Sequence, residues 1–233
     1  MKRILCGAAL ILSVAAMAQQ PDWANLQRYS SANKEVAQSP RNERLVVFLG
    51  NSITEKWAAM HPSFFTDNGY VGRGISGQTS YQFLVRFRED VIKLHPAIVV
   101  INAGTNDVAE NTGPYSEEYT FGNIVSMVEL AKANGIRPVL SAVLPAAGFN
   151  WNRTITDAPD KIESLNARIK AYAVEHGIPF VDYYTPMLAG ADGALNADYT
   201  NDGVHPTEAG YDVMEGIVLQ TLRSLPEVGS RVP

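Results

Sequence analysis

One serine, one aspartate and one histidine stand in this chain where they could share a reaction. Ser52 follows the apolar run 45–49, and Asp202 and His205 lie three residues apart near the C-terminal end. A serine hydroxyl becomes a good nucleophile when a histidine takes its proton and a carboxylate orients and stabilises that histidine. The three residue types therefore indicate nucleophilic cleavage of an ester. Each also has a structural alternative: Ser52 could cap a helix, and Asp202 with His205 could form a capped turn before the last helix.

The segments between these residues alternate between apolar runs and helical patterns. The runs predict five strands and the 3.6-residue periodicity predicts helices between them. Strands are expected over 45–49, 69–75, 97–102, 138–144 and 179–182, and helices after Ser52 and over 80–94, 116–134, 157–176 and 207–222. Such alternation is typical of one α/β domain, a parallel sheet with helices on both faces.

The candidate residues follow the ends of these strands. Ser52 comes after the first strand, Gly77 after the second and Asn106 after the third, and the Asp202/His205 pair lies in the loop after the fifth. Right-handed crossovers bring the carboxyl ends of parallel strands to one edge of the sheet. We therefore expect residues more than 150 positions apart to converge there.

In these four blocks the chain resembles the SGNH hydrolase superfamily, also called GDSL esterases and lipases. Ser52, Gly77, Asn106 and His205 match its four named residues, and Asp202 precedes His205 at the family spacing. The resemblance covers about 45–222 and is strongest to bacterial members similar to platelet-activating-factor acetylhydrolase subunits. It implies a single three-layer domain with a five-stranded, mainly parallel sheet of flavodoxin-like type. Asn51 departs from the family motif, which has Asp at that position.

The resemblance also implies a role for each matched residue. Ser52 would be the nucleophile, His205 the general base and Asp202 the carboxylate that orients His205. The oxyanion hole would combine the backbone N–H groups of Ser52 and Gly77 with the side-chain amide of Asn106. One such donor is worth roughly 3–4 kcal/mol in the transition state.

The N-terminal residues have the pattern of an export signal. Lys2 and Arg3 precede an apolar stretch, which ends at the small-residue site Ala16-Met17-Ala18. The alternative, a membrane anchor, is disfavoured because the stretch is short for a bilayer span. We therefore expect 1–18 to be a signal peptide, 19–44 an extension that packs on the domain with a helix over 22–36, and 45–233 the hydrolase domain. Cleavage would remove Cys6, the single cysteine. It would leave an exported protein, periplasmic or extracellular, without a membrane anchor.

Several other classes of function are disfavoured by composition. A formal net charge of -5 argues against a nucleic-acid partner. No group of His, Cys, Asp and Glu has metal-ligand spacing, so neither a metal nor another cofactor is expected. His61, His95 and His176 are interpreted as structural, and Asp107 as a loop or cap residue. The sequence leaves the oligomeric state open.

The substrate is indicated less directly than the chemistry. Asn111, Phe149 and Trp151 lie in loops at the catalytic edge and could wall a substrate pocket, although they could equally pack those loops against the domain. No long apolar lid insertion is visible, which favours short acyl groups over long lipids. The hypothesis is a secreted esterase that removes short acyl groups, such as O-acetyl, from carbohydrates. A lysophospholipase or thioesterase with the same triad, or a non-catalytic glycan-binding protein on this fold, remain the alternatives.

Overall fold

The computed structural model describes residues 22–39 and 45–226. The predicted signal peptide, with Cys6, lies outside the described residues. Within the described ranges no helix combines the length and apolar character that a membrane crossing requires.

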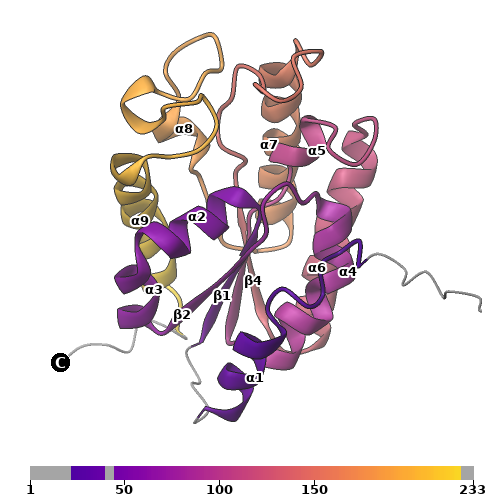
Figure 1. Ribbon diagram of the computed structural model, residues 1–233, viewed down its shortest axis with the longest axis vertical. Helices are drawn as coiled ribbons and strands as arrows, with labels where there is room; N and C mark the ends of the chain where they lie inside the picture. The colour runs from indigo at the N-terminus through magenta and orange to yellow at the C-terminus, as the bar shows by residue number, and fades with distance from the viewer. Residues whose placement is uncertain (1–21, 40–44, 227–233) are drawn as a thin grey trace, which may run out of the picture.

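The described strands form one sheet in the order β2-β1-β3-β4-β5, and each neighbouring pair is parallel. This confirms the predicted α/β fold with a five-stranded sheet of flavodoxin-like order (Figure 1). The strand order reverses between β1 and β3, and in folds of this type ligands bind at that point, beyond the carboxyl ends of the strands. The strands are β1 Val46–Gly50, β2 Tyr70–Gly74, β3 Ile98–Ile101, β4 Arg137–Ser141 and β5 Phe180–Val181.

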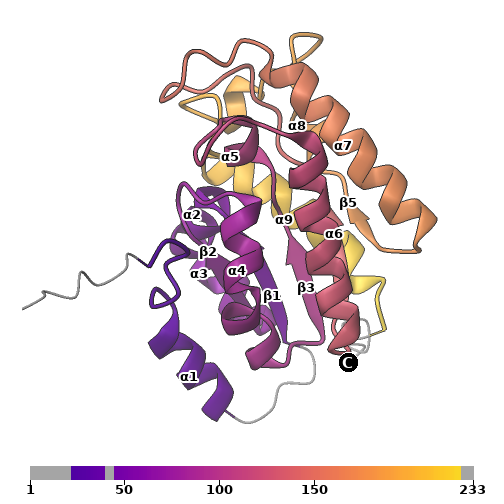
Figure 2. The same cartoon turned by 90° about the vertical axis from the view of Figure 1, so that its right-hand side faces the viewer.

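Side chains of each strand alternate between two hydrophobic cores, one on each face of the sheet. Val47 and Leu49 of β1 belong to one core, and Val46 and Phe48 belong to the other. Figures 1 and 2 show the resulting three layers, with helices on both faces of the sheet. The first core is covered by α4 (Ser80–Asp90), α6 (Glu117–Ala133) and α7 (Ala158–Glu175), and the second by α2 (Ser52–Met60), α3 (Pro62–Asn68) and α9 (Glu208–Arg223).

The second core joins α2 to α9. The Trp57 ring of α2 stacks between Phe64 and the α9 residue Tyr211, with ring centroids 5.0 and 5.8 Å away. The Tyr211 hydroxyl donates to the Ile53 carbonyl at 2.8 Å. The helix that begins at Ser52 is therefore fixed against the helix that follows His205.

The structure corrects several predicted bounds. The expected helix over 22–36 is replaced by turns followed by α1 (Ser30–Gln38), because Asn25 adopts a left-handed φ of 55° and interrupts the helix. The helix expected over 80–94 divides into α4 and a 3-10 turn at Ile92–Leu94. The helical pattern after Ser52 also predicts an inward-facing Met60, but Met60 is exposed because the chain turns into α3 at Pro62.

The Ala142 N–H still donates to the Val181 carbonyl of β5, but beyond Ala142 the predicted end of β4 loses its ladder partners. The Asn166 side chain instead accepts from the Val143 N–H at 2.7 Å and donates to the Val143 carbonyl at 2.9 Å. Elements that were not predicted are the helix α3 (Pro62–Asn68), the short helices α5 (Thr105–Val108) and α8 (Tyr184–Met187), and a 3-10 turn at Ala197–Tyr199.

Candidate active site

The residues singled out in the sequence meet at the carboxyl edge of the sheet. Ser52 is the first residue of α2, directly beyond β1, and Asn106 lies in α5, beyond β3. These two elements border the point where strand order reverses, the usual ligand site of such folds. Gly77 follows β2, and His205 lies in the segment that leads into α9. The loops after β3 and β4 and the segment before α9 all lie at the upper end of the molecule in Figure 1.

Ser52 does not cap its helix, because Asn51 takes that position. The Asn51 side chain accepts from the Ile53 N–H at 2.9 Å and is almost fully buried. Asn caps a helix about as well as Asp does, and it avoids burying a charge here. Asn in place of Asp at position 51 therefore keeps the helix cap. The Ser52 hydroxyl does not take part in capping and is free for other contacts.

That hydroxyl lies against a histidine. Ser52 Oγ is 2.8 Å from His205 Nε2, and His205 Nδ1 is 2.7 Å from Asp202 Oδ2. An ionised carboxylate can only accept, so Nδ1 carries the hydrogen and the neutral ring presents its Nε2 lone pair to Ser52. This tautomer is the one that can take a proton from serine.

The Asp202 carboxylate is held in place by three N–H groups. Its other oxygen accepts from the backbone N–H of His205 at 2.7 Å and of Val204 at 2.9 Å. Partial burial by itself would raise the pKa of Asp202, but hydrogen bonds from the backbone and ring of His205 and from Val204 outweigh it and lower that pKa to about 2. The carboxylate is therefore ionised at neutral pH.

Three residues of this region offer N–H donors. Among the described residues the backbone N–H groups of Ser52 and Gly77 have no hydrogen-bond partner. Asn106 Nδ2 donates one hydrogen to the Gln78 carbonyl at 2.8 Å, which fixes the amide and leaves its second hydrogen available. Gly77 has a φ of 78°, a left-handed conformation that favours glycine.

A cavity of about 310 Å³ contains these groups. Its lining consists of Ser52, Lys56, Ser76, Gly77, Asn106, Asn111, Trp151 and His205. Ser76 and Lys56 were not among the residues predicted for the site, although both lie close in the chain to predicted ones, Gly77 and Ser52.

Two of the three predicted pocket residues line this cavity. The Trp151 indole donates to Asn111 Oδ1 at 2.9 Å, and Asn111 Nδ2 donates to the Gly77 carbonyl at 3.0 Å. Trp151 is 48% exposed, and the centroid of its ring lies 6.3 Å from that of the His205 ring. Phe149 is buried in the core and packs against Trp151, with ring centroids 5.2 Å apart, so it supports the wall without lining it.

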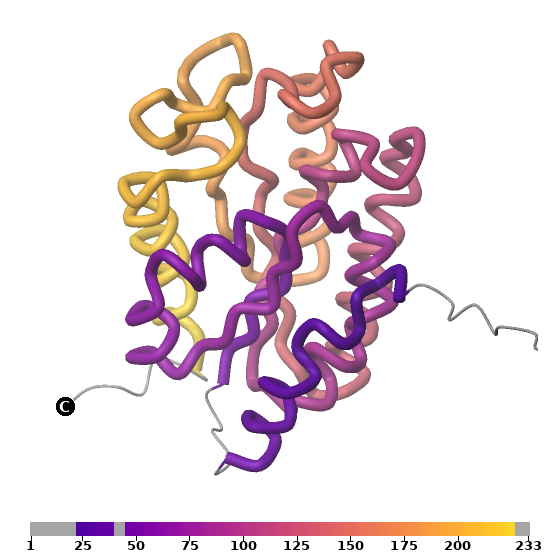
Figure 3. Tube along the Cα trace, in the orientation of Figure 1, coloured from indigo at the N-terminus to yellow at the C-terminus, as the bar shows by residue number. Residues whose placement is uncertain are grey.

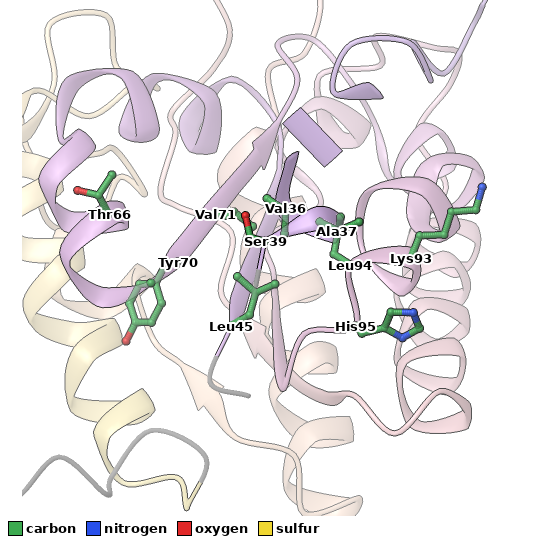
Figure 4. Close-up of a pocket in the computed structure, with 11 residues that line it drawn as sticks. Val36, Ala37, Ser39, Leu45, Thr66, Tyr70, Val71, Lys93, Leu94 and His95 are labelled. Carbon is green, nitrogen blue, oxygen red and sulfur yellow. The ribbon is translucent and has the colours of Figure 1, made fainter. Parts of the chain in front are cut away.

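A larger cavity, of about 690 Å³, lies at the opposite end of the sheet, near the starts of β1 and β2 (Figure 4). Its lining includes Leu45, Tyr70, Leu94 and His95. Neither Ser52 nor His205 lines it. None of its described lining residues is a serine or threonine whose hydroxyl is hydrogen-bonded to a histidine, so the smaller cavity is the candidate active site.

Other titratable groups have structural partners. Burial raises the pKa of Asp107, whose oxygens accept from the Ser80 N–H and hydroxyl and from Thr120. Within the described ranges, the group of side chains spaced to hold a metal is His61, Asp212 and Glu215. There His61 Nδ1 pairs directly with Glu215 at 2.9 Å, and the group contains no residue of the cavity.

Comparison with known proteins identifies the family. The model of the GDSL-like lipase/acylhydrolase family matches residues 48–213. A candidate acylhydrolase from Bacteroides fragilis, of known crystal structure, is 66% identical, with a TM-score of 0.85 over 87% of this chain and 98% of that one.

Two curated relatives are more distant. Esterase TesA of Pseudomonas aeruginosa is 27% identical over 76% of this chain and 83% of its own. An acetylxylan esterase of Xylanibacter ruminicola is 22% identical over 58% of this chain but only 30% of its own. The family match confirms the resemblance drawn from the four sequence blocks. The chain is an ester-hydrolysing enzyme that belongs to the GDSL-like lipase/acylhydrolase family.

Proposed function

We propose that the protein is an exported serine esterase that removes short acyl groups, chiefly O-acetyl, from carbohydrates. The observation that carries the proposal is the hydrogen-bonded line Ser52–His205–Asp202 beside three N–H donors in one cavity. These are the parts that acyl transfer to serine requires.

The reaction proceeds in two halves through an acyl-enzyme. Ser52 Oγ attacks the ester carbonyl carbon while His205 Nε2 takes its proton, and Asp202 stabilises the resulting imidazolium. The oxyanion of the tetrahedral intermediate accepts from the N–H groups of Ser52 and Gly77 and the free amide hydrogen of Asn106. As the intermediate collapses, the C–O bond to the alcohol breaks and His205 returns the proton to the leaving oxygen.

Water then completes the cycle. His205 takes a proton from a water molecule that attacks the acyl carbon, and the same donors hold the second oxyanion. Collapse releases the carboxylic acid and returns the proton to Ser52 Oγ. One water molecule is consumed for each ester cleaved, and every proton transfer runs through Ser52 and His205.

Three observations favour a short acyl group on a sugar. The cavity of about 310 Å³ has room for a small acyl group, and Trp151 presents a half-exposed ring on which a sugar face can pack. Asn111 adds amide groups that can bond hydroxyls. The acetylxylan esterase relative supports the same class of substrate, and the signal-like sequence at 1–18 supports export.

The test is hydrolysis of p-nitrophenyl esters from acetate to decanoate, followed by acetate release from acetylated xylan. Ser52→Ala should abolish both activities. A matched control is Ser116→Ala, which removes a serine that caps α6 and does not line the cavity; it should keep nearly full activity.

Preference for the longest chains, with turnover of lysophospholipids and no acetate release, would replace the proposal by a lipid-directed one. Wild-type protein without activity on any ester, but binding acetylated glycans, would support the glycan-binding alternative.

A further inference from the structure

The loop that carries Gly77 is tied to the start of α2 by one carboxylate. We call residues 74–78 the Gly77 loop. The backbone N–H and hydroxyl of Ser76 both donate to Glu55 Oε2, at 2.8 and 2.5 Å. Glu55 lies in the first turn of α2, three residues after Ser52. A single side chain therefore joins the nucleophile's helix to the residue that precedes Gly77.

The loop also packs closely on that helix. A Cβ on Gly74 would lie 2.2 Å from the Glu55 backbone nitrogen, so only glycine fits there. The Ile75 N–H donates to the Gly50 carbonyl at 3.1 Å. Contacts of this kind fix the path of the loop, while the bonds to Glu55 hold Ser76, the residue just before Gly77.

The other Glu55 oxygen is held by a cation. Arg28 Nη2 donates to Oε1 at 2.8 Å. Burial alone would raise the pKa of Glu55, but hydrogen bonds from Ser76 and Arg28 outweigh it and place this pKa below its ordinary value. Glu55 is therefore an anion at neutral pH, and hydrogen bonds to an anion are shorter and stronger than neutral ones.

Arg28 belongs to a segment that we call the N-terminal strap, residues 22–38. The Tyr29 hydroxyl of the strap donates to the Gly74 carbonyl, and Gln78 Nε2 donates to the Ala24 carbonyl at 2.7 Å. The strap thus holds both ends of the Gly77 loop. In Figure 3 the strap is the indigo tube, which runs from beside α4 down to α1 at the lower end of the molecule.

A buried arginine of α4, Arg86, also holds the Gly77 loop. Arg86 Nε donates to Gln78 Oε1 at 2.6 Å, and its Nη2 donates to the Gly50 carbonyl at 2.8 Å. Arg86 Nη1 lies 2.9 Å from Asp90 Oδ2, and this ion pair compensates the charge of the buried guanidinium. The same guanidinium therefore bonds the end of β1, just before Ser52, and the end of the Gly77 loop.

An oxyanion donor works only when its N–H is aimed at the charge that develops, and a misplacement of about 1 Å can cost on the order of a hundredfold. We propose that Glu55 is a positioning residue that aims the Gly77 N–H, and that Arg28 of the strap holds Glu55 for this task. The proposal rests on the serine esterase function proposed above and assigns the strap to its catalytic apparatus.

The experiment measures kcat and KM for p-nitrophenyl acetate and inhibition by phenylboronic acid, whose adduct with serine mimics the tetrahedral intermediate. Glu55→Ala should lower kcat on the order of tenfold to a hundredfold with KM changed less than about threefold, and should weaken boronate inhibition by a similar factor. Glu55→Gln keeps an acceptor for Ser76 and should recover part of the loss. The matched control, Glu118→Gln, breaks an ion pair with Arg168 remote from the cavity and should leave both readouts unchanged.

Arg28 is tested by a double-mutant cycle. Arg28→Ala should lower kcat less than Glu55→Ala does, and adding it to Glu55→Ala should change little, because Arg28 acts through Glu55. Ser76→Ala, which keeps the backbone bond to Glu55, is the milder variant to use if Glu55→Ala does not fold.

Two results would overturn the proposal: kcat of the Glu55 or Ser76 variants equal to that of Glu118→Gln, or a loss confined to KM with boronate inhibition intact. Failure of the underlying function is visible separately, as full activity in Ser52→Ala.

Discussion

Replacing Asn106 by alanine tests the oxyanion hole most directly. The Asn106 side chain is buried, and one amide hydrogen is committed to the Gln78 carbonyl at 2.8 Å. The second hydrogen is one of three candidate donors, and the other two belong to the backbone of Ser52 and Gly77. Asn106→Ala therefore removes one donor of three and leaves nucleophile and base in place.

The expected cost follows from that count. Loss of one oxyanion donor costs about 3 kcal/mol of transition-state stabilisation. At about 1.36 kcal/mol per factor of ten, this lowers kcat by roughly 150-fold, while KM changes less than about threefold. The Gln78 carbonyl also loses its partner, so the fold should lose about 1–3 kcal/mol of stability.

A matched variant separates these two effects. Asn166, like Asn106, is a buried asparagine. Its side chain makes two hydrogen bonds to the backbone of Val143 at the end of β4, and it does not line the cavity. Asn166→Ala should lower the melting temperature and keep kcat within about threefold of wild type. Steady-state hydrolysis of p-nitrophenyl acetate well below both melting temperatures gives the comparison. Equal losses of kcat in both variants, or a loss in KM alone for Asn106→Ala, would refute the assignment.

Two further predictions concern Asp202 and Trp151. Asp202→Asn should lower kcat by roughly 10⁴-fold, because an amide can hold the wrong imidazole tautomer; a drop of less than about tenfold would contradict the assigned role. Because folding lowers the pKa of Asp202 from 3.8 to about 2, its carboxylate contributes stability that is complete above about pH 4 and lost as the pH falls toward 2. Acid denaturation should therefore be less steep in this window for Asp202→Asn than for wild type, and identical profiles would count against the lowered pKa. Trp151→Ala should raise KM for acetylated xylo-oligosaccharides roughly tenfold, since covering about 50 Å² of ring is worth about 1.3 kcal/mol. Trp151→Phe should keep most of the affinity, and an equal loss on p-nitrophenyl acetate would show that Trp151 shapes the catalytic residues instead of binding sugar.

The strand pattern was predictable chiefly because β1 and β3 are buried along their whole length, on both faces of the sheet. Continuous apolar runs such as 98–101 leave few alternatives, and the turns after them are marked by Gly, Asn and Ser. With parallel strands, residues at strand ends share an edge whatever their separation in sequence. This is why Ser52 and His205, 153 positions apart, could be expected together before any distance was known.

Other features depend on contacts that sequence patterns do not encode. The early end of β4 follows from Asn166 replacing a ladder partner, and the late start of α1 follows from the left-handed Asn25. Phe149 and Trp151 are two residues apart and both aromatic, yet one is buried and the other half-exposed. Such differences are decided by tertiary packing, and periodicity in a short loop cannot resolve them.

The supports of the Gly77 loop illustrate the same limit. Glu55 and Ser76 are ordinary residues for a helix surface and a loop, and no motif singles them out. Their importance comes from position: α2 starts at the nucleophile, so its first turn is the nearest rigid element to the loop that carries Gly77. A carboxylate there can fix the loop relative to Ser52 without entering the cavity, and Arg28 compensates its charge from the strap. In this fold the site is assembled from the ends of separate strands. The loops after these strands must therefore be held in fixed positions relative to one another, by contacts of residues that lie behind the site. The strap and Glu55 supply such contacts between β1 and β2, where the backbone donors of the proposed oxyanion hole originate.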